Sequence, residues 1–146
     1  MNKKLFPLIF LLSLFLFNSS FASNSSFYKD AINEFEKKNF EKSKFLFQRY
    51  LVINPKDYSS YLYLAKIFEE EENQIEVEKN LNTTLLLNPK NEEALYMLME
   101  LQLSLSNFSK VKDLNEKFAL ICSKLCNKKV FIAEKMNNLQ TSDETN

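Results

Sequence analysis

The strongest constraint on this chain is a period of 34 residues. Pro55 and Pro89 are 34 positions apart, and each lies in the tripeptide Asn-Pro-Lys. The same interval separates Asn39, Asn73 and Asn107, which are three identical residues. It also separates apolar or small residues in four further sets: Phe27, Tyr61 and Leu95; Ala31, Ala65 and Met99; Ser43, Val77 and Val111; and Ile53, Leu87 and Ile121. A fixed period of this length is typical of stacked structural repeats, so the sequence predicts a repeat architecture.

Each repeat is predicted to be a pair of helices. In the first repeat, apolar residues recur at helical spacing over Phe27–Lys37 and again over Phe40–Ile53. Asn39 separates the two stripes, and its short polar side chain suits a tight turn or a helix N-cap. Pro55 ends the second helix, because its ring removes a backbone donor and restricts the preceding residue. The later repeats predict helices over Tyr58–Glu71, Gln74–Leu87, Glu92–Leu105 and Phe108–Ile121.

On these residues the chain resembles a tetratricopeptide-repeat protein. That family places a large apolar residue early in the first helix, a small residue one turn later, and Pro after the second helix. Phe27, Ala31, Ser43, Phe47 and Pro55 fit this pattern in the first repeat. The departures are the absence of Gly throughout the chain, and Met99, Asn115 and Ser123 at family positions of the third repeat.

The resemblance implies an all-α fold, an α-solenoid of three helix-turn-helix repeats followed by a C-terminal capping helix. The repeats are expected at 24–57, 58–91 and 92–125, which together span 24–125. The capping helix is expected over residues 127–139, where apolar residues gather on one side. Residues 140–146 are polar and are expected to form a disordered tail.

The resemblance also implies where a partner binds, because the first helix of each repeat lines a concave groove in this family. The side chains expected in this groove are Tyr28, Ile32, Phe35, Leu62, Lys66, Glu69, Tyr96, Glu100 and Leu103. Apolar anchors with isolated charges suit a polypeptide that presents aromatic or aliphatic side chains. A second copy of the chain could bind the same face. The expected function is therefore that of a scaffold or adaptor for protein–protein interaction.

Composition argues against catalysis and against several classes of ligand. The chain has no Gly, which excludes glycine-rich phosphate-binding loops, and no His, which removes the commonest general base and zinc ligand. The 19 basic and 19 acidic residues are scattered, so no nucleic acid partner is predicted. We therefore expect a protein that is not an enzyme and has no cofactor, no metal site and no small-molecule substrate.

The first 22 residues have the pattern of a secretory signal peptide. Lys3 and Lys4 precede the apolar run Leu5–Phe17, and small residues follow at Ser20 and Ala22. This order predicts cleavage after Ala22. This run of thirteen residues, which Pro7 and Ser13 interrupt, spans about 20 Å as a helix, short of a hydrocarbon core of roughly 30 Å. The chain is thus expected to be a small exported, periplasmic bacterial protein that meets the membrane only through its signal peptide; retention of that segment as an anchor is the alternative.

Cys122 and Cys126 are the two cysteines of the chain, and they are four positions apart. Export would place them in an oxidising compartment, where such a pair usually forms a disulfide. The sequence therefore predicts a disulfide that fixes the junction of the third repeat and the capping helix. A rival function follows from the same pair, which could make the chain a thiol–disulfide redox protein.

Overall fold

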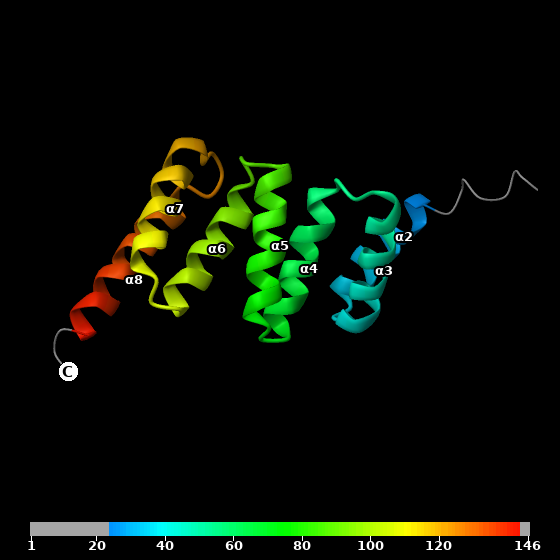
Figure 1. Cartoon of the computed structure of the whole chain (residues 1–146), viewed down its shortest axis with the longest axis horizontal. Helices are drawn as coiled ribbons and strands as arrows, with labels where there is room; N and C mark the ends of the chain where they lie inside the picture. The colour runs from blue at the N-terminus through cyan, green and yellow to red at the C-terminus, as the bar shows by residue number, and fades with distance from the viewer. Residues whose placement is uncertain (1–23, 144–146) are drawn as a thin grey trace, which may run out of the picture. The chain divides into compact units, whose positions relative to one another are not determined.

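The computed structural model describes residues 24–143, which are helical and contain no strand within that range (Figure 1). The expected signal peptide and its cleavage site lie outside these residues. The helices are α2 (Asn24–Glu36), α3 (Phe40–Ile53), α4 (Tyr58–Glu70), α5 (Gln74–Leu87), α6 (Glu92–Ser104), α7 (Phe108–Ile121) and α8 (Asn127–Asp143). The chain divides after Ile53 into two compact units, the first with the hairpin α2–α3 and the second with α4 to α8.

The first unit is built around a small aromatic core. Phe47 and Ala31 are fully buried, and the buried Ser43 hydroxyl donates a hydrogen bond of 2.8 Å to the Ala31 carbonyl. The Tyr28 ring lies 5.9 Å from the Phe47 ring and 5.2 Å from the Tyr50 ring, measured between centroids. Small residues at 31 and 43 let α2 and α3 approach closely, which explains their place in the periodic pattern.

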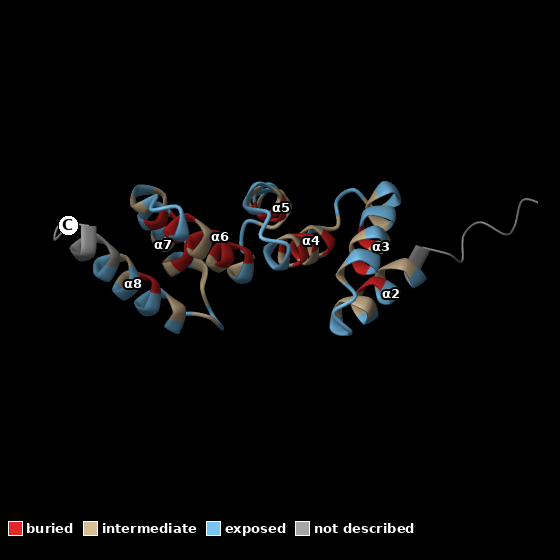
Figure 2. Cartoon of the chain, turned by 90° about the horizontal axis from the view of Figure 1, so that it is seen from below, coloured by how far each residue is buried: buried red, intermediate tan, exposed pale blue. Residues whose placement is uncertain are grey.

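The second unit has one continuous core that the periodic residues supply. Val77 and Leu81 of α5, Val111 of α7 and Met99 of α6 are at most 4% exposed. Met99 occupies a position where a small residue was expected, and it is fully buried. Ile132 of α8 is also fully buried against this core, so α8 covers the last hairpin (Figure 2).

The turn inside each hairpin requires a left-handed backbone conformation. Lys38, Glu72 and Ser106 have φ angles of 60°, 55° and 55°, and they are also 34 residues apart. In the last of these turns the Ser106 N–H donates to the Leu103 carbonyl at 3.0 Å, and the Asn107 N–H donates to the Gln102 carbonyl at 2.9 Å. This pair of bonds is the Schellman motif that ends a helix, and Gly is its usual left-handed residue. The chain forms the motif three times without any Gly.

Side-chain caps begin the first helix of the second and third repeats. The Asp57 carboxylate accepts a hydrogen bond of 2.7 Å from the Ser60 N–H, and Asn91 Oδ1 accepts one of 2.9 Å from the Ala94 N–H. Each cap satisfies one of the backbone donors that a helix N-terminus leaves without a partner. Of the three periodic Asn residues, Asn73 caps α5, whereas Asn107 makes no side-chain cap bond.

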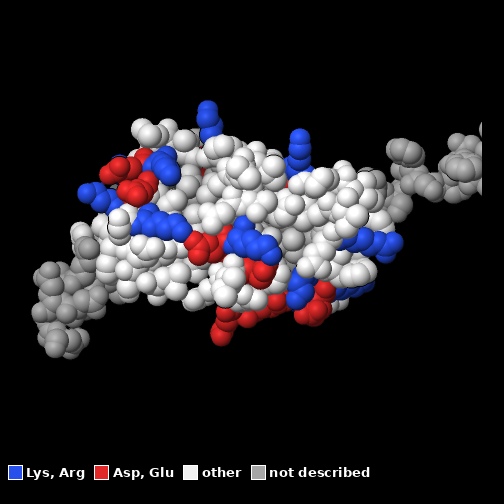
Figure 3. Space-filling view, viewed as in Figure 1, with Lys and Arg blue, Asp and Glu red and all other residues white. Residues whose placement is uncertain are grey.

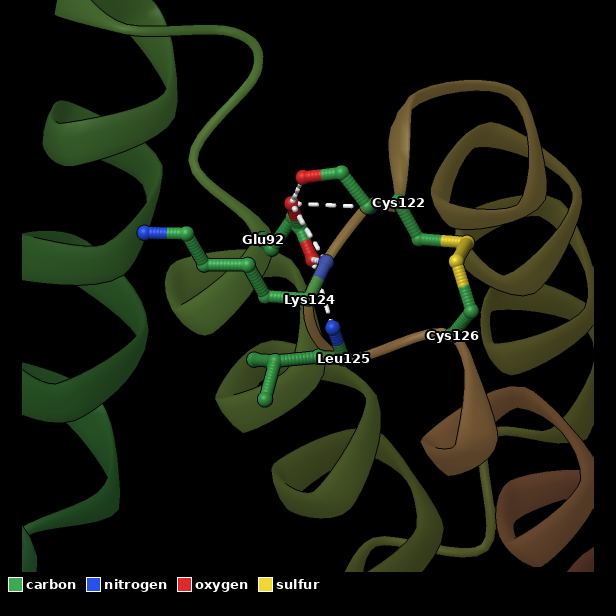
Figure 4. The surroundings of a disulfide bond; sticks show 6 residues. Glu92, Cys122, Lys124, Leu125 and Cys126 are labelled. Atoms are coloured by element: carbon green, nitrogen blue, oxygen red, sulfur yellow. Dashed lines mark hydrogen bonds between the residues drawn. A yellow bond between two sulfur atoms is a disulfide. The ribbon is translucent and has the colours of Figure 1, made fainter.

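A carboxylate closes the junction between α7 and α8, where Ser123 stands in place of the third Pro. Glu92, the first residue of α6, accepts hydrogen bonds from the Ser123 hydroxyl at 2.7 Å, the Lys124 N–H at 3.0 Å and the Leu125 N–H at 2.8 Å (Figure 4). These bonds, the Leu125 N–H first, lower the pKa of Glu92 to about 2. They hold the 122–126 loop against the start of α6.

The two cysteines lie at opposite ends of this loop. Their sulfur atoms are 2.21 Å apart and their Cα atoms 5.2 Å apart, and Figure 4 draws the pair as a disulfide. The turn expected between Cys122 and Cys126 is present, because α7 ends at Ile121 and α8 begins at Asn127. The covalent bond between the two thiols stays a prediction of the sequence.

The last helix is longer than the sequence indicated. α8 runs to Asp143, whereas the capping helix was expected to end at residue 139, so residues 140–143 are helical rather than disordered. Its 17 residues contain no Pro or Gly that would end a helix, which explains the extension. Within residues 24–143, no helix combines the length and the apolar content needed to cross a membrane.

Candidate functional site

The three groove residues expected in the first unit lie on α2, and all three are partly buried. Tyr28 packs in the aromatic core described above, and the Phe35 ring lies 5.6 Å from the Phe40 ring. Ile32 lies next to the fully buried Ala31. Each side chain keeps a partly exposed surface, but a large part of it already serves the packing of α2 on α3.

In the second unit, two of the expected groove residues belong to the core. Leu62 of α4 is 7% exposed and Leu103 of α6 is 2% exposed. So little surface remains that neither side chain can anchor a partner while this packing persists. Their contribution is to hold α4 and α6 in place beneath the more exposed residues of the same helices.

The structure brings the other four expected residues of this unit to one surface, which we call the α4–α6 face. These four are Lys66 and Glu69 on α4 and Tyr96 and Glu100 on α6, and Glu93 on α6 completes the face through its ion pair with Lys66. Lys66 Nζ lies 2.7 Å from Glu93 Oε1, which links the two helices, and the Tyr96 hydroxyl donates a hydrogen bond of 2.7 Å to Glu100 Oε1. Burial, and then the neighbouring Glu100 carboxylate, raise the pKa of Tyr96 well above its ordinary value.

A pocket of about 480 Å³ opens at one end of the α4–α6 face. Three carboxylates line it, those of Glu69, Glu72 and Glu100, together with Gln74, Val77, Leu101 and Ser104. Burial, then Glu100 and then Glu70 raise the pKa of Glu69, although Lys66 acts in the opposite direction. Three carboxylates and no Lys or Arg line the pocket, so a cationic group there would offset the mutual repulsion of the carboxylates.

At its other end the α4–α6 face continues onto the capping helix, where the charge is positive. Lys128 Nζ lies 4.8 Å from the centroid of the Tyr96 ring. The ammonium groups of Lys128 and Lys135 each lie 5.8 Å from the centroid of the Phe131 ring, which is 47% exposed. On the face of the molecule that Figure 3 shows, acidic and basic side chains are interspersed. The α4–α6 face differs in having an acidic end and a basic aromatic end.

Sequence reasoning missed the contribution of α8, because residues 127–139 were interpreted only as a cap. A signal was present: Lys128, Phe131 and Lys135 follow one another at spacings of three and four, which places them on one side of a helix. What the sequence does not reveal is that this side borders Tyr96, 32 residues earlier in the chain.

Comparison with known proteins identifies the architecture. At the level of sequence, no protein-family model and no curated protein matches the chain. Among solved structures, the TPR2B domain of yeast Sti1, determined in a complex with pHsp70, matches with a TM-score of 0.72 and 10% identity, over 80% of this chain and 97% of that domain. This chain has the tetratricopeptide-repeat fold.

Two further tetratricopeptide-repeat structures support the same assignment. The Sgt2 TPR domain from Aspergillus fumigatus matches with a TM-score of 0.68 and 12% identity, over 84% of this chain and 83% of that one. The type III secretion translocator chaperone SycD of Yersinia enterocolitica matches with a TM-score of 0.72 and 12% identity, over 88% of this chain and 91% of its own. These likenesses establish the fold, and they confirm the all-α repeat solenoid that the 34-residue period predicted.

Proposed function

We propose that this tetratricopeptide-repeat chain is a non-enzymatic adaptor that binds a polypeptide segment on the α4–α6 face. The observation that carries the proposal is the continuous line of contacts from Glu100 through Tyr96 to Lys128 and Phe131. This line joins a pocket of three carboxylates to an exposed aromatic ring between two lysines. The Sti1 domain with the same fold was determined in a complex with pHsp70, which supports a protein partner here.

The chemistry of the face specifies the kind of segment it would take. A Lys or Arg side chain of the partner fits the pocket of Glu69, Glu72 and Glu100, where it offsets the mutual repulsion of the three carboxylates. An apolar side chain fits against the exposed Phe131 ring, and a carboxylate of the partner suits Lys128 and Lys135. The partner segment is therefore of mixed charge and has a fixed direction on the face.

The test compares two charge reversals. Affinity capture from the native envelope, followed by mass spectrometry, identifies the partner, and calorimetry then measures its affinity. We expect Glu69→Lys with Glu100→Lys to weaken binding at least about tenfold, as loss of a desolvated charge pair does. Glu116→Lys changes an exposed carboxylate on α7 that lies outside the pocket, and it should bind like the unmodified chain. Equal affinity of both variants, with unchanged helicity by circular dichroism, would place the binding site elsewhere.

We further propose that the protein acts after export, in the periplasm. The N-terminal pattern of two lysines, an apolar run and small residues supports this location. N-terminal sequencing of the exported protein should begin at Ser23. A protein recovered from the envelope that still begins at Met1 would instead support a retained anchor.

A further inference from the structure

The second helix of every repeat exposes one large apolar residue at the same position. Val52, Leu86 and Leu120 are 82%, 81% and 86% exposed, and they are 34 residues apart. A single exposed leucine is ordinary on a protein surface. Here, however, an apolar residue with nearly the same exposure recurs at the same position of each repeat. Packing of the hairpins does not explain it, because these side chains are exposed.

In the second unit, two of these residues border a groove. It is formed by α5, α6 and α7, and its volume is about 670 Å³. The exposed Leu86 of α5 and Leu120 of α7 both line it, and so do the buried Leu95, Leu98 and Leu114. This groove is distinct from the pocket on the α4–α6 face, because the two share no lining residue. One patch thus contains both projecting leucines and an apolar hollow.

The rim of the groove has balanced charge. Lys110 is already paired with Glu78. Asp113 and Lys117 lie one turn apart on α7 and are exposed, and neither makes a hydrogen bond or ion pair with another described residue. The rim therefore offers one acid and one base that are open to an outside partner. An anionic lipid surface would meet Asp113 as a like charge, and a peptide of a single sign would be repelled by one of the two.

We propose that this groove binds a second copy of the chain in a two-fold symmetric dimer. A two-fold interface must be complementary to itself, so the same patch has to supply both projections and hollows. If the two α7 helices pack antiparallel, Leu120 of each copy enters the groove of the other. The same arrangement sets Asp113 of one copy opposite Lys117 of the other. The unpaired acid and base then become two intermolecular ion pairs.

Sedimentation equilibrium of the full chain provides the test. Between about 1 and 100 μM, a range in which a modest interface dissociates, the mean mass should rise from that of a monomer toward twice that value. Leu120→Glu should stay monomeric throughout and keep its helicity. Ile75→Glu is the matched control, because Ile75 on α5 is 80% exposed but does not line the groove, and this variant should dimerise like the unmodified chain.

A charge exchange tests the antiparallel arrangement. Asp113→Lys alone and Lys117→Asp alone should each weaken dimerisation about tenfold, whereas the two changes together should restore it, because like charges then become opposite again. A monomeric wild-type chain, or a Leu120→Glu variant that dimerises normally, would overturn the proposal. The proposal would also be overturned if the unmodified protein were monomeric and bound anionic vesicles, and if Leu120→Glu abolished that binding. The groove would then be a lipid site. Because the α4–α6 face is separate, Leu120→Glu should still bind the partner of the adaptor.

Discussion

Glycine at the left-handed turn positions should stabilise this protein. The left-handed conformation costs a residue with a Cβ atom roughly 1–2 kcal/mol, and Gly does not incur that cost. Gly also gains backbone entropy in the unfolded chain, which offsets about 0.4–1 kcal/mol of the benefit. Ser106 has a φ of 55° and an exposed, uncharged side chain. Replacing it by Gly therefore changes mainly the conformational cost and the entropy of the unfolded chain. We therefore expect Ser106→Gly to raise the free energy of unfolding by about 0.5–1 kcal/mol, or roughly 2–5 °C in Tm.

Urea unfolding followed by circular dichroism measures this difference. Ser104→Gly is the matched control, because it makes the same substitution two residues earlier, in the last residue of α6. There the residue is helical and its hydroxyl donates to the Leu101 carbonyl at 2.7 Å, so Gly should lower the free energy of unfolding by at least about 0.5 kcal/mol. Opposite signs at the two positions support the argument from backbone strain. Destabilisation of similar size at both positions would refute it.

Three further predictions concern charge and the cysteine pair. Because the pKa of Glu92 is lowered to about 2, the stabilising effect of its carboxylate should be complete above pH 4.5 and lost as the pH falls toward 2. Glu92→Gln should therefore be less stable than the unmodified chain at neutral pH. In urea titrations, its free energy of unfolding should depend less on pH between 4.5 and 2. Glu69, whose pKa is raised, is unfavourable when ionised, so Glu69→Gln should raise the free energy of unfolding at neutral pH by less than about 1 kcal/mol while weakening partner binding. Non-reduced protein from the envelope should be lighter by two hydrogens than the reduced form, and reduction should cost about 2 kcal/mol of stability for a loop closed across four positions. The stability of a Cys122→Ser, Cys126→Ser variant should not change with reductant. Freely alkylated thiols in the exported protein would contradict the disulfide. Loss of a redox phenotype in the variant would favour the redox function.

The helices could be predicted closely because their boundaries depend on local signals. The sequence placed the second-repeat helices at Tyr58–Glu71 and Gln74–Leu87, and the structure ends the first of them one residue earlier, at Glu70. Asn-Pro-Lys and the repeated Asn mark these boundaries within a few residues of chain. The end of α8 was less predictable, because a polar segment without Pro or Gly contains no stop signal.

The candidate site was only partly predictable, because it depends on contacts between distant residues. Leu62 and Leu103 are buried, although Tyr96 and Glu69, which occupy the same positions in other repeats, are more exposed. The reason is that the first helix of a repeat packs on more than one neighbouring helix. The contact of Lys128 with Tyr96 and the clamp of Glu92 on the 123–125 backbone both join segments about 30 residues apart. Neither contact leaves a pattern in the sequence, because each depends on the path of the loop before α8.

The setting of Tyr96 also has an optical consequence. The chain contains six Tyr and no Trp, so its near-ultraviolet absorption is dominated by phenol rings. Tyr96 donates a hydrogen bond to Glu100, a carboxylate that lines the acidic pocket, and a lysine ammonium lies over its ring. A cation that draws Glu100 away from the phenol will alter the absorption of this one ring. The difference spectrum between the native chain and Tyr96→Phe can thus report occupancy of the pocket without any attached label.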